Sequence, residues 1–168
     1  HENNGEDQYE YQTDFYVASE FYQRSNQGLL ITDIDNNGEN EMYCLTSGVN
    51  SLSGDFISPG YFFVVEGVND VSSLSYANFN LFSSYAGGLR GVYLGNADGD
   101  DKPNVYLAGH YNEAVYDWEY SGGDPINPAS YEEKIVFLDD TTDNYTPGND
   151  QGKLRISKVF TGDIDNDG

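Results

Sequence analysis

Apolar side chains occur along this chain in short runs, separated by stretches rich in Gly, Asn and Asp. Runs of β-branched and aromatic residues bounded by such turn formers are typical of strands, and no segment sustains the apolar period of about 3.6 residues that marks an amphipathic helix. The clearest predicted strands lie at 29–31, 42–45, 61–65, 92–94, 105–108, 134–138 and 159–161, with a weaker one at 74–82. The pattern predicts an all-β chain, in which 120–128 and 139–152 are irregular surface connections.

An acidic loop recurs three times at a nearly constant interval. Its copies begin at Asp33, Asn96 and Asp163, so they are 63 and 67 residues apart, and the first reads Asp-Ile-Asp-Asn-Asn-Gly-Glu-Asn-Glu. Each copy follows an apolar run and the first two also precede one, which predicts that each loop joins two antiparallel strands. Internal repeats at such a period indicate stacked supersecondary units.

About four strands per repeat are typical of the blades of a β-propeller. The chain then divides into an N-terminal segment, 1–24, that could hold strands of a preceding blade, two blades at 25–88 and 89–155, and the start of a further blade at 156–168. These roughly two and a half repeats make a partial propeller, because a ring needs about four to eight blades. The partners expected on this basis are the remainder of a longer chain or other copies of the same chain.

The charge of the chain excludes two classes of partner. With 29 acidic and 7 basic side chains the net charge is −22, which would repel the phosphates of nucleic acids and anionic membranes. No apolar run approaches the roughly 18 residues of a membrane-spanning helix, so membrane insertion is not expected. The 15 Tyr and 9 Phe residues supply bulky groups for a packed core, which disordered acidic chains lack.

The acidic loops have the composition of cation sites. Positions 1, 3 and 5 of each loop carry Asp or Asn, an alternation that can turn three oxygen ligands to one side of a tight turn. Position 6 requires a positive φ, which Gly38 and Gly168 accept freely and which we also expect of Asp101. About six to eight hard oxygen ligands suit Ca²⁺ better than Mg²⁺, and zinc or copper would need His or Cys. An EF-hand is excluded because it needs Glu at position 12, where Cys44 and Leu107 stand.

The alternative interpretation of these loops is an Asx-rich hairpin turn without a metal, since Asn, Asp and Gly are ordinary turn formers. Recurrence of the loop with matching flanks favours calcium. The second loop has only two carboxylates among its ligand positions, Asp98 and Asp100, against three in the first. We therefore expect the second loop to bind the cation more weakly.

The motif Asp-x-Asp-x-Asp-Gly-x-x-Asp between two short strands, repeated at intervals of sixty-odd residues, resembles the FG-GAP/VCBS repeats of integrin-like, seven-bladed β-propellers. The resemblance covers residues 25–168, with Asn37 in place of Asp at position 5, and Glu41 and Asn104 in place of Asp at position 9. It implies one Ca²⁺ per loop, an extracellular or cell-surface location, and a role in adhesion or carbohydrate recognition. The ligands that it implies are Asp33, Asp35, Asn37, the Glu39 carbonyl and Glu41, then Asn96, Asp98, Asp100, the Lys102 carbonyl and Asn104, and finally Asp163, Asp165 and Asp167.

Two further groups of residues carry possible chemistry. His110 beside Tyr111 could act as the general base of a polysaccharide lyase, but a surface or strand-end histidine is the commoner case. Trp118 between Tyr116 and Tyr120 could form a platform for sugar rings, although alternating aromatics more often pack a core.

The leading functional interpretation is a non-enzymatic, calcium-binding extracellular β-propeller segment that acts in adhesion, in recognition of a protein or glycan, or in surface assembly. The alternatives are a propeller-based polysaccharide lyase or hydrolase, and a structural subunit of an extracellular filament. We expect partner contact at 116–120. The single cysteine, Cys44, is expected to be buried, and Asn144 begins a glycosylation sequon that a eukaryotic secretory source could use.

Overall fold

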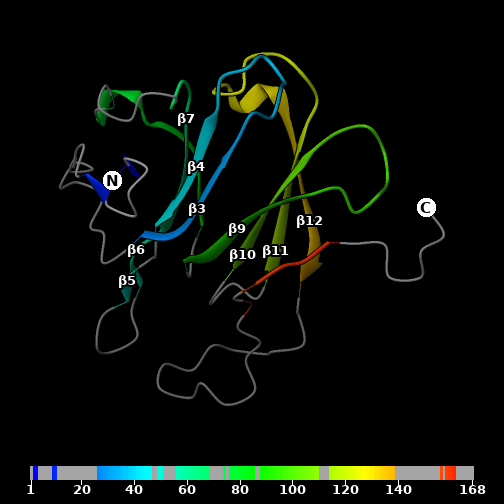
Figure 1. Cartoon of the computed structure of the whole chain (residues 1–168). Coiled ribbons are helices and arrows are strands. Elements are labelled where there is room, and N and C mark those ends of the chain that lie inside the picture. Colours follow the sequence, from blue (N-terminus) through cyan, green and yellow to red (C-terminus); the bar gives the residue numbers. More distant parts are fainter. Residues whose placement is uncertain are drawn as a thin grey trace.

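The computed structural model of the chain (Figure 1) describes residues 2–3, 9–10, 26–46, 49–50, 56–68, 74, 76–85, 88–109, 114–138, 156 and 158–161. These residues form strands and two short 3₁₀ helices, η2 (Tyr76–Asn78) and η3 (Pro128–Ser130). The prediction of an all-β chain is therefore confirmed for the described residues.

Two four-stranded antiparallel sheets make up most of the described chain. The first has the order β3–β4–β7–β8 and falls within 25–88, and the second has the order β9–β10–β11–β12 and falls within 89–155. Their strands are β3 (Asn26–Thr32), β4 (Glu41–Thr46), β7 (Gly60–Val65), β8 (Asn80–Tyr85), β9 (Leu89–Gly95), β10 (Asn104–Gly109), β11 (Ala114–Tyr120) and β12 (Tyr131–Leu138).

Two short strand pairs accompany these sheets. β1 (Glu2–Asn3) pairs with β2 (Tyr9–Glu10), and β5 (Val49–Asn50) pairs with β6 (Phe56–Ser58). The prediction of four antiparallel strands per repeat is confirmed for both repeats. The two sheets form no closed ring within the described residues, so their place in a propeller stays a prediction.

Two strands predicted from apolar runs differ in the structure. The segment 74–82 does not form one strand, because Leu74 packs into an apolar cluster and η2 follows it, so that β8 begins only at Asn80. The run 159–161 is not assigned to a strand. It lies beside β9 through side-chain contacts, with the Phe160 ring 6.3 Å from that of Tyr93 and Thr161 against Gly95.

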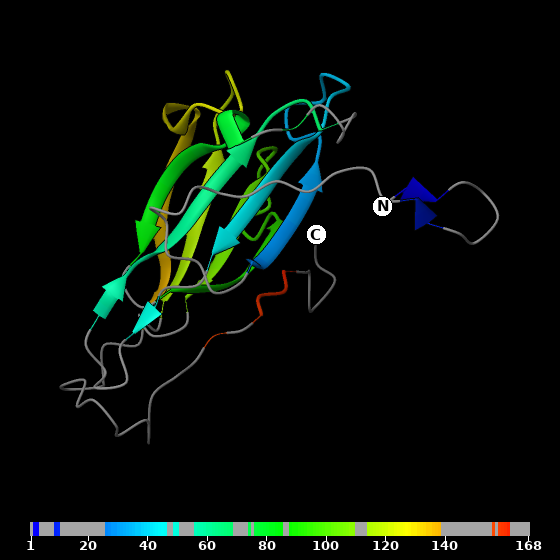
Figure 2. The ribbon, with the colours of Figure 1, turned by 90° about the vertical axis from the view of Figure 1, so that its left-hand side faces the viewer.

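The sheets pack face to face over a shared aromatic core (Figure 2). Phe62 on β7 lies at its centre, with ring centroids 5.5 Å from Trp118 and 5.4 Å from Phe82. At one edge β3 passes close to β9, where a Cβ built on Gly28 would lie 3.0 Å from the Val92 nitrogen. Burial of these apolar faces in contact with each other is the main force that holds the two repeats together.

The two sheets present opposite faces to this shared core. Tyr43 on β4 lies in the core, whereas its counterpart 63 residues later, Tyr106 on β10, does not. Conversely, Leu107 lies in the core, and its counterpart Cys44 belongs to a second apolar cluster on the other face of the first sheet. Because neighbouring side chains of a strand alternate between faces, the repeats are stacked head to tail.

Candidate metal centre

The first acidic loop connects β3 to β4 as a tight hairpin. Thr32 pairs with Glu41 at its base, and the chain reverses through positive φ angles at Asn36 (59°) and Gly38 (93°). The predicted positive φ of Gly38 is confirmed.

The second loop, between β9 and β10, turns differently from the prediction. Gly99 has the positive φ (71°), and within the described chain Asn36 is the only non-glycine residue with one, so the prediction for Asp101 is wrong. Position 4 of each loop, held by Asn36 and Gly99, is the shared turning point. Asn and Gly are the residues that enter the left-handed region at least cost.

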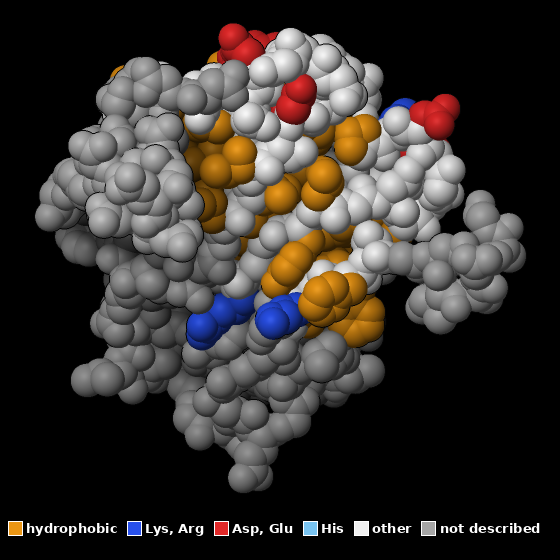
Figure 3. All heavy atoms as spheres, viewed as in Figure 1, with side chains coloured by type: hydrophobic (Ala, Val, Ile, Leu, Met, Phe, Trp, Pro, Cys, Tyr) orange, Lys and Arg blue, Asp and Glu red, His pale blue; other side chains and the backbone are white. Residues whose placement is uncertain are grey.

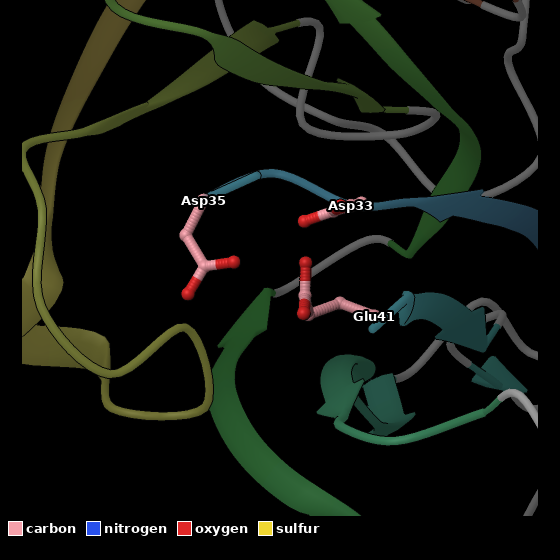
Figure 4. A group of neighbouring side chains, drawn as sticks. All are labelled: Asp33, Asp35 and Glu41. Atoms are coloured by element: carbon pink, nitrogen blue, oxygen red, sulfur yellow. The ribbon is translucent and has the colours of Figure 1, made fainter. Parts of the chain in front are cut away.

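Three carboxylates of the first loop converge on one point (Figure 4). Oxygen atoms of Asp33, Asp35 and Glu41 all lie within 4.8 Å of one another. Loop amides fix two of these groups, since the Gly38 N–H donates to Asp33 Oδ2 at 2.9 Å and the Asn37 N–H lies 3.0 Å from Asp33 Oδ1 and 3.1 Å from Asp35 Oδ1. The sequence therefore predicted correctly that these three residues meet.

Glu41 is the unusual member of this cluster because it is completely buried. Its Oε2 accepts a hydrogen bond of 2.8 Å from the Ile34 N–H, but its Oε1 has no hydrogen-bond partner in the described structure. Burial raises the pKa of Glu41 to about 7. The hydrogen bond from Ile34 lowers this pKa, and the nearby carboxylates of Asp35, Asp33 and Glu66 raise it by smaller amounts. A buried, half-satisfied carboxylate among other carboxylates is unfavourable unless a cation neutralises it.

The other two predicted ligands of this loop are the Asn37 side chain and the Glu39 carbonyl. The Asn37 amide donates to Asp35 Oδ2 at 3.0 Å, and its Oδ1 accepts from the Glu39 N–H at 2.7 Å. The Glu39 side chain is exposed. Coordination by Asn37 and by the Glu39 carbonyl stays a prediction.

Two acidic residues outside the loop add to its negative potential. Glu66 follows β7 directly, and the pairing of Met42 with Val65 sets it opposite Glu41. The pKa of Glu66 is raised mainly by partial burial, and to a smaller extent by repulsion from the carboxylates of Asp124, Glu39 and Asp35. Glu66 was recognisable in the sequence as the residue after the apolar run 61–65, whereas Asp124 comes from the second repeat and its approach depends on how the sheets pack.

The second loop also gathers three carboxylates, but not the predicted set. Oxygen atoms of Asp98, Asp100 and Glu119 lie within 4.8 Å of one another. Glu119 belongs to β11 and pairs with Asn104, the first residue of β10. Glu119 could not be predicted from the loop sequence, because the strand that carries it is brought to the loop only by sheet pairing.

The two asparagines predicted as ligands of the second loop have other contacts. Asn96 donates to the Asp100 carbonyl and accepts a hydrogen bond of 2.8 Å from the Gly99 N–H. Asn104 is buried and donates to Asp117 Oδ1 at 3.0 Å, which leaves its own Oδ1 without a partner in the described structure.

A lysine lies among the carboxylates of the second loop. Lys102 Nζ is 2.6 Å from Glu119 Oε1 and 3.8 Å from Asp100 Oδ2, and Lys134 Nζ is 2.9 Å from Glu119 Oε2. Hydrogen bonds from Lys102 and Lys134 lower the pKa of Glu119, and the same contact with Glu119 raises the pKa of Lys102.

A cleft of about 490 Å³ separates the two loops. Its lining includes Asp33 and Asn36 from the first loop, and Asn96, Asp100 and Lys102 from the second. Polar groups of both repeats thus face one shared space.

The remaining candidate residues have different outcomes. Trp118 and Tyr120 are buried in the shared core, so they pack the fold, and the expected partner contact at 116–120 is wrong for these two side chains. Cys44 is buried, as predicted. Asp163, Asp165, Asp167, Gly168, His110, Tyr111 and Asn144 lie outside the described residues.

Comparisons with protein-family models, curated proteins and solved structures give no match. The resemblance to FG-GAP/VCBS repeats therefore stays a prediction. In the described part of the chain, no helix is long and apolar enough to cross a membrane.

Proposed function

We propose that this chain is a calcium-binding β module in which Asp33, Asp35 and Glu41 hold the ion at the end of the first sheet. The observation that carries this proposal is Glu41 Oε1, which is buried, has no hydrogen-bond partner in the described structure and belongs to the cluster of converging carboxylates. A bound cation would neutralise these groups and complete the coordination of this oxygen.

The donor set favours calcium over other cations. All three acidic groups supply hard carboxylate oxygens, and the neighbouring amide and carbonyl groups of the loop are of the same class. Ca²⁺ accepts such ligands with flexible geometry, whereas Mg²⁺ requires a tighter octahedron and retains water. We propose an extracellular or cell-surface setting for this module, in line with the resemblance of its loops to FG-GAP/VCBS repeats.

The ion would act on the packing of the two repeats as well as on its own loop. Tyr43 follows Glu41 by two residues on β4, and its hydroxyl lies 2.9 Å from that of Tyr131 on β12. Tyr131 in turn donates to the Pro125 carbonyl at 3.0 Å, in the connection that carries Asp124. Ordering the first loop therefore stabilises the interface between the sheets and the walls of the cleft.

This arrangement suits binding more than catalysis. A rigid loop positioned by a packed scaffold is a common platform for recognition, and the cleft between the loops is within the size range of ligand sites. We propose that the module recognises a protein or glycan at this cleft, in adhesion or in surface assembly, rather than at the buried strand 116–120.

Thermal unfolding with millimolar calcium and with excess chelator tests the metal site. Calcium should raise the melting temperature of the wild-type chain, because an ion that binds only the native state adds about 1.4 kcal/mol at a tenfold excess over its dissociation constant. Asp33→Asn should remove most of this gain. Asp101→Asn, which deletes an equal charge from an exposed position outside both clusters, should preserve it. An equal response of both variants would reject the site.

A further inference from the structure

The two loops differ in charge at equivalent positions. Position 7 is Glu39 in the first loop and Lys102 in the second, 63 residues later. The residue opposite position 9 on the neighbouring strand is acidic in both repeats, Glu66 in the first and Glu119 in the second. The second repeat thus has the same acidic surroundings, but with a cationic residue at position 7.

The side chain of Lys102 reaches into the acidic cluster of its own repeat. Its ammonium group lies 2.6 Å from Glu119 Oε1 and 3.8 Å from Asp100 Oδ2. Glu119 itself is only 3% exposed, and Lys134 binds its second oxygen at 2.9 Å. Both oxygens of this carboxylate are therefore already in charge-assisted hydrogen bonds, which are the stronger class of hydrogen bond.

The first cluster lacks this arrangement. Among the described residues, no Lys or Arg forms an ion pair with Asp33, Asp35 or Glu41. Each loop has three carboxylates within the same 4.8 Å limit. The two clusters differ because, in the described chain, only the second contains a lysine ammonium group.

We propose that Lys102 is the built-in cation of the second loop and that it excludes a metal ion from the Asp98, Asp100 and Glu119 cluster. A calcium ion needs its oxygen ligands at about 2.3–2.6 Å, so it could enter this cluster only by displacing the ammonium group from Glu119. This replaces the expectation of a second, weaker calcium site. The proposal concerns the second loop alone and does not depend on calcium binding by the first.

Counting the calcium ions bound per chain tests this proposal, by equilibrium dialysis and by calorimetric titration, with near-UV circular dichroism to verify folding. The double variant Asp98→Asn with Asp100→Asn should bind as many ions as the wild-type chain, because its second loop holds none in either form. Lys102→Gln should bind one ion more than the wild-type chain, because Glu119 Oε1 then lacks its ammonium partner and can join Asp98 and Asp100 in binding an ion.

Two matched variants isolate the position of the charge. Lys102→Arg keeps a cation in the loop, and Lys134→Gln removes the other lysine of Glu119 while leaving Lys102 in place, so neither should gain an ion. Loss of one ion in the double aspartate variant would overturn the proposal, since wild-type loop two would then hold a metal. A folded Lys102→Gln chain that gains no ion would overturn it as well. If Lys102→Gln does not fold, the double aspartate variant still decides.

Discussion

Glu41 is a completely buried carboxyl group, so the stability of the metal-free fold should depend on pH. Its folded pKa of about 7 lies above the ordinary value of 4.5, so folding takes up a proton between these two pH values. For such a group, the metal-free fold is penalised as the pH rises through this window, and the penalty is absent below pH 4.5.

Glu41→Gln should therefore stabilise the metal-free chain at pH 7.5 while abolishing its stabilisation by calcium. The glutamine carbonyl can still accept from the Ile34 N–H, and the buried charge is gone. We expect a gain of roughly 1–3 kcal/mol over the metal-free wild type at pH 7.5, which shrinks toward zero near pH 4.5. Urea unfolding of both chains in chelator across this pH range measures the difference.

Glu132→Gln on β12 is the control for this comparison, because Glu132 is an exposed carboxylate whose side chain is 63% accessible. It should change neither the pH dependence nor the calcium response. A Glu41→Gln chain that is less stable than the wild type at every pH would mean that the buried charge of Glu41 does not destabilise the metal-free fold.

At the scale of the elements, Gly60 marks the closest approach between the start of β7 and neighbouring backbone. A Cβ at this position would lie 2.8 Å from both the Gly88 Cα and the Thr46 carbonyl oxygen, and 3.0 Å from the Leu89 nitrogen. All three are main-chain atoms that cannot rotate away. This site joins the first sheet to the beginning of β9.

Gly60→Ala should therefore destabilise the chain more than Gly99→Ala. Gly99 has a positive φ of 71°, but a Cβ there would have no neighbour within 4 Å, so its cost is that of the backbone conformation alone, about 1–2 kcal/mol. Overpacking at Gly60 should cost about 3 kcal/mol or more. Denaturant midpoints of the two variants test the order, and equal midpoints would mean that the backbone around Gly60 yields.

The sequence predicted those elements that depend on local patterns. The runs 42–45, 61–65 and 105–108 became β4, β7 and β10, because short apolar runs between turn formers carry their own strand signal. Local patterns could not predict where β8 starts or that 159–161 is not a strand. Both depend on tertiary packing, of Leu74 in the second apolar cluster and of Phe160 against Tyr93.

The candidate site residues also differ in whether local sequence could predict them. Asp33, Asp35 and Glu41 are close in sequence, so loop spacing sufficed to bring them together in the prediction. Glu119 enters the second cluster from another strand, through the register that sets Asn104 opposite it. The salt bridge from Lys102 to Glu119 depends on this register, so a count of loop carboxylates could not predict it.

At the scale of the whole molecule, head-to-tail stacking leaves unlike surfaces at the two ends of the pair of sheets. On the outer face of the first sheet, Leu29 and Ile31 at the β3 edge are 54% and 51% exposed, although the second apolar cluster on β4 and β7 is buried. The counterpart of Leu29 on β9, Val92, is only 7% exposed because the first sheet covers it, whereas the counterpart of Ile31, Leu94, is 44% exposed. Figure 3 shows apolar side chains gathered across one face of the molecule, with acidic side chains at its upper end.

An exposed apolar edge strand of this kind invites association with another sheet. Heterologous contacts between unlike faces continue from one unit to the next until they close or form a fibre. We therefore expect the chain of residues 1–168 to associate with itself as its concentration rises, through the β3 surface formed by Leu29 and Ile31.

The double variant Leu29→Thr with Ile31→Thr should weaken this association without unfolding the chain, because both side chains are half exposed and β-branched threonine suits a strand. Ile135→Thr tests whether the second sheet supplies the opposite contact surface, since Ile135 is 56% exposed on β12. Sedimentation velocity over a hundredfold range of concentration measures the effect. A wild-type chain that stays monomeric throughout, or a double variant that associates as strongly as the wild type, would show that the β3 surface is not the one that other sheets cover.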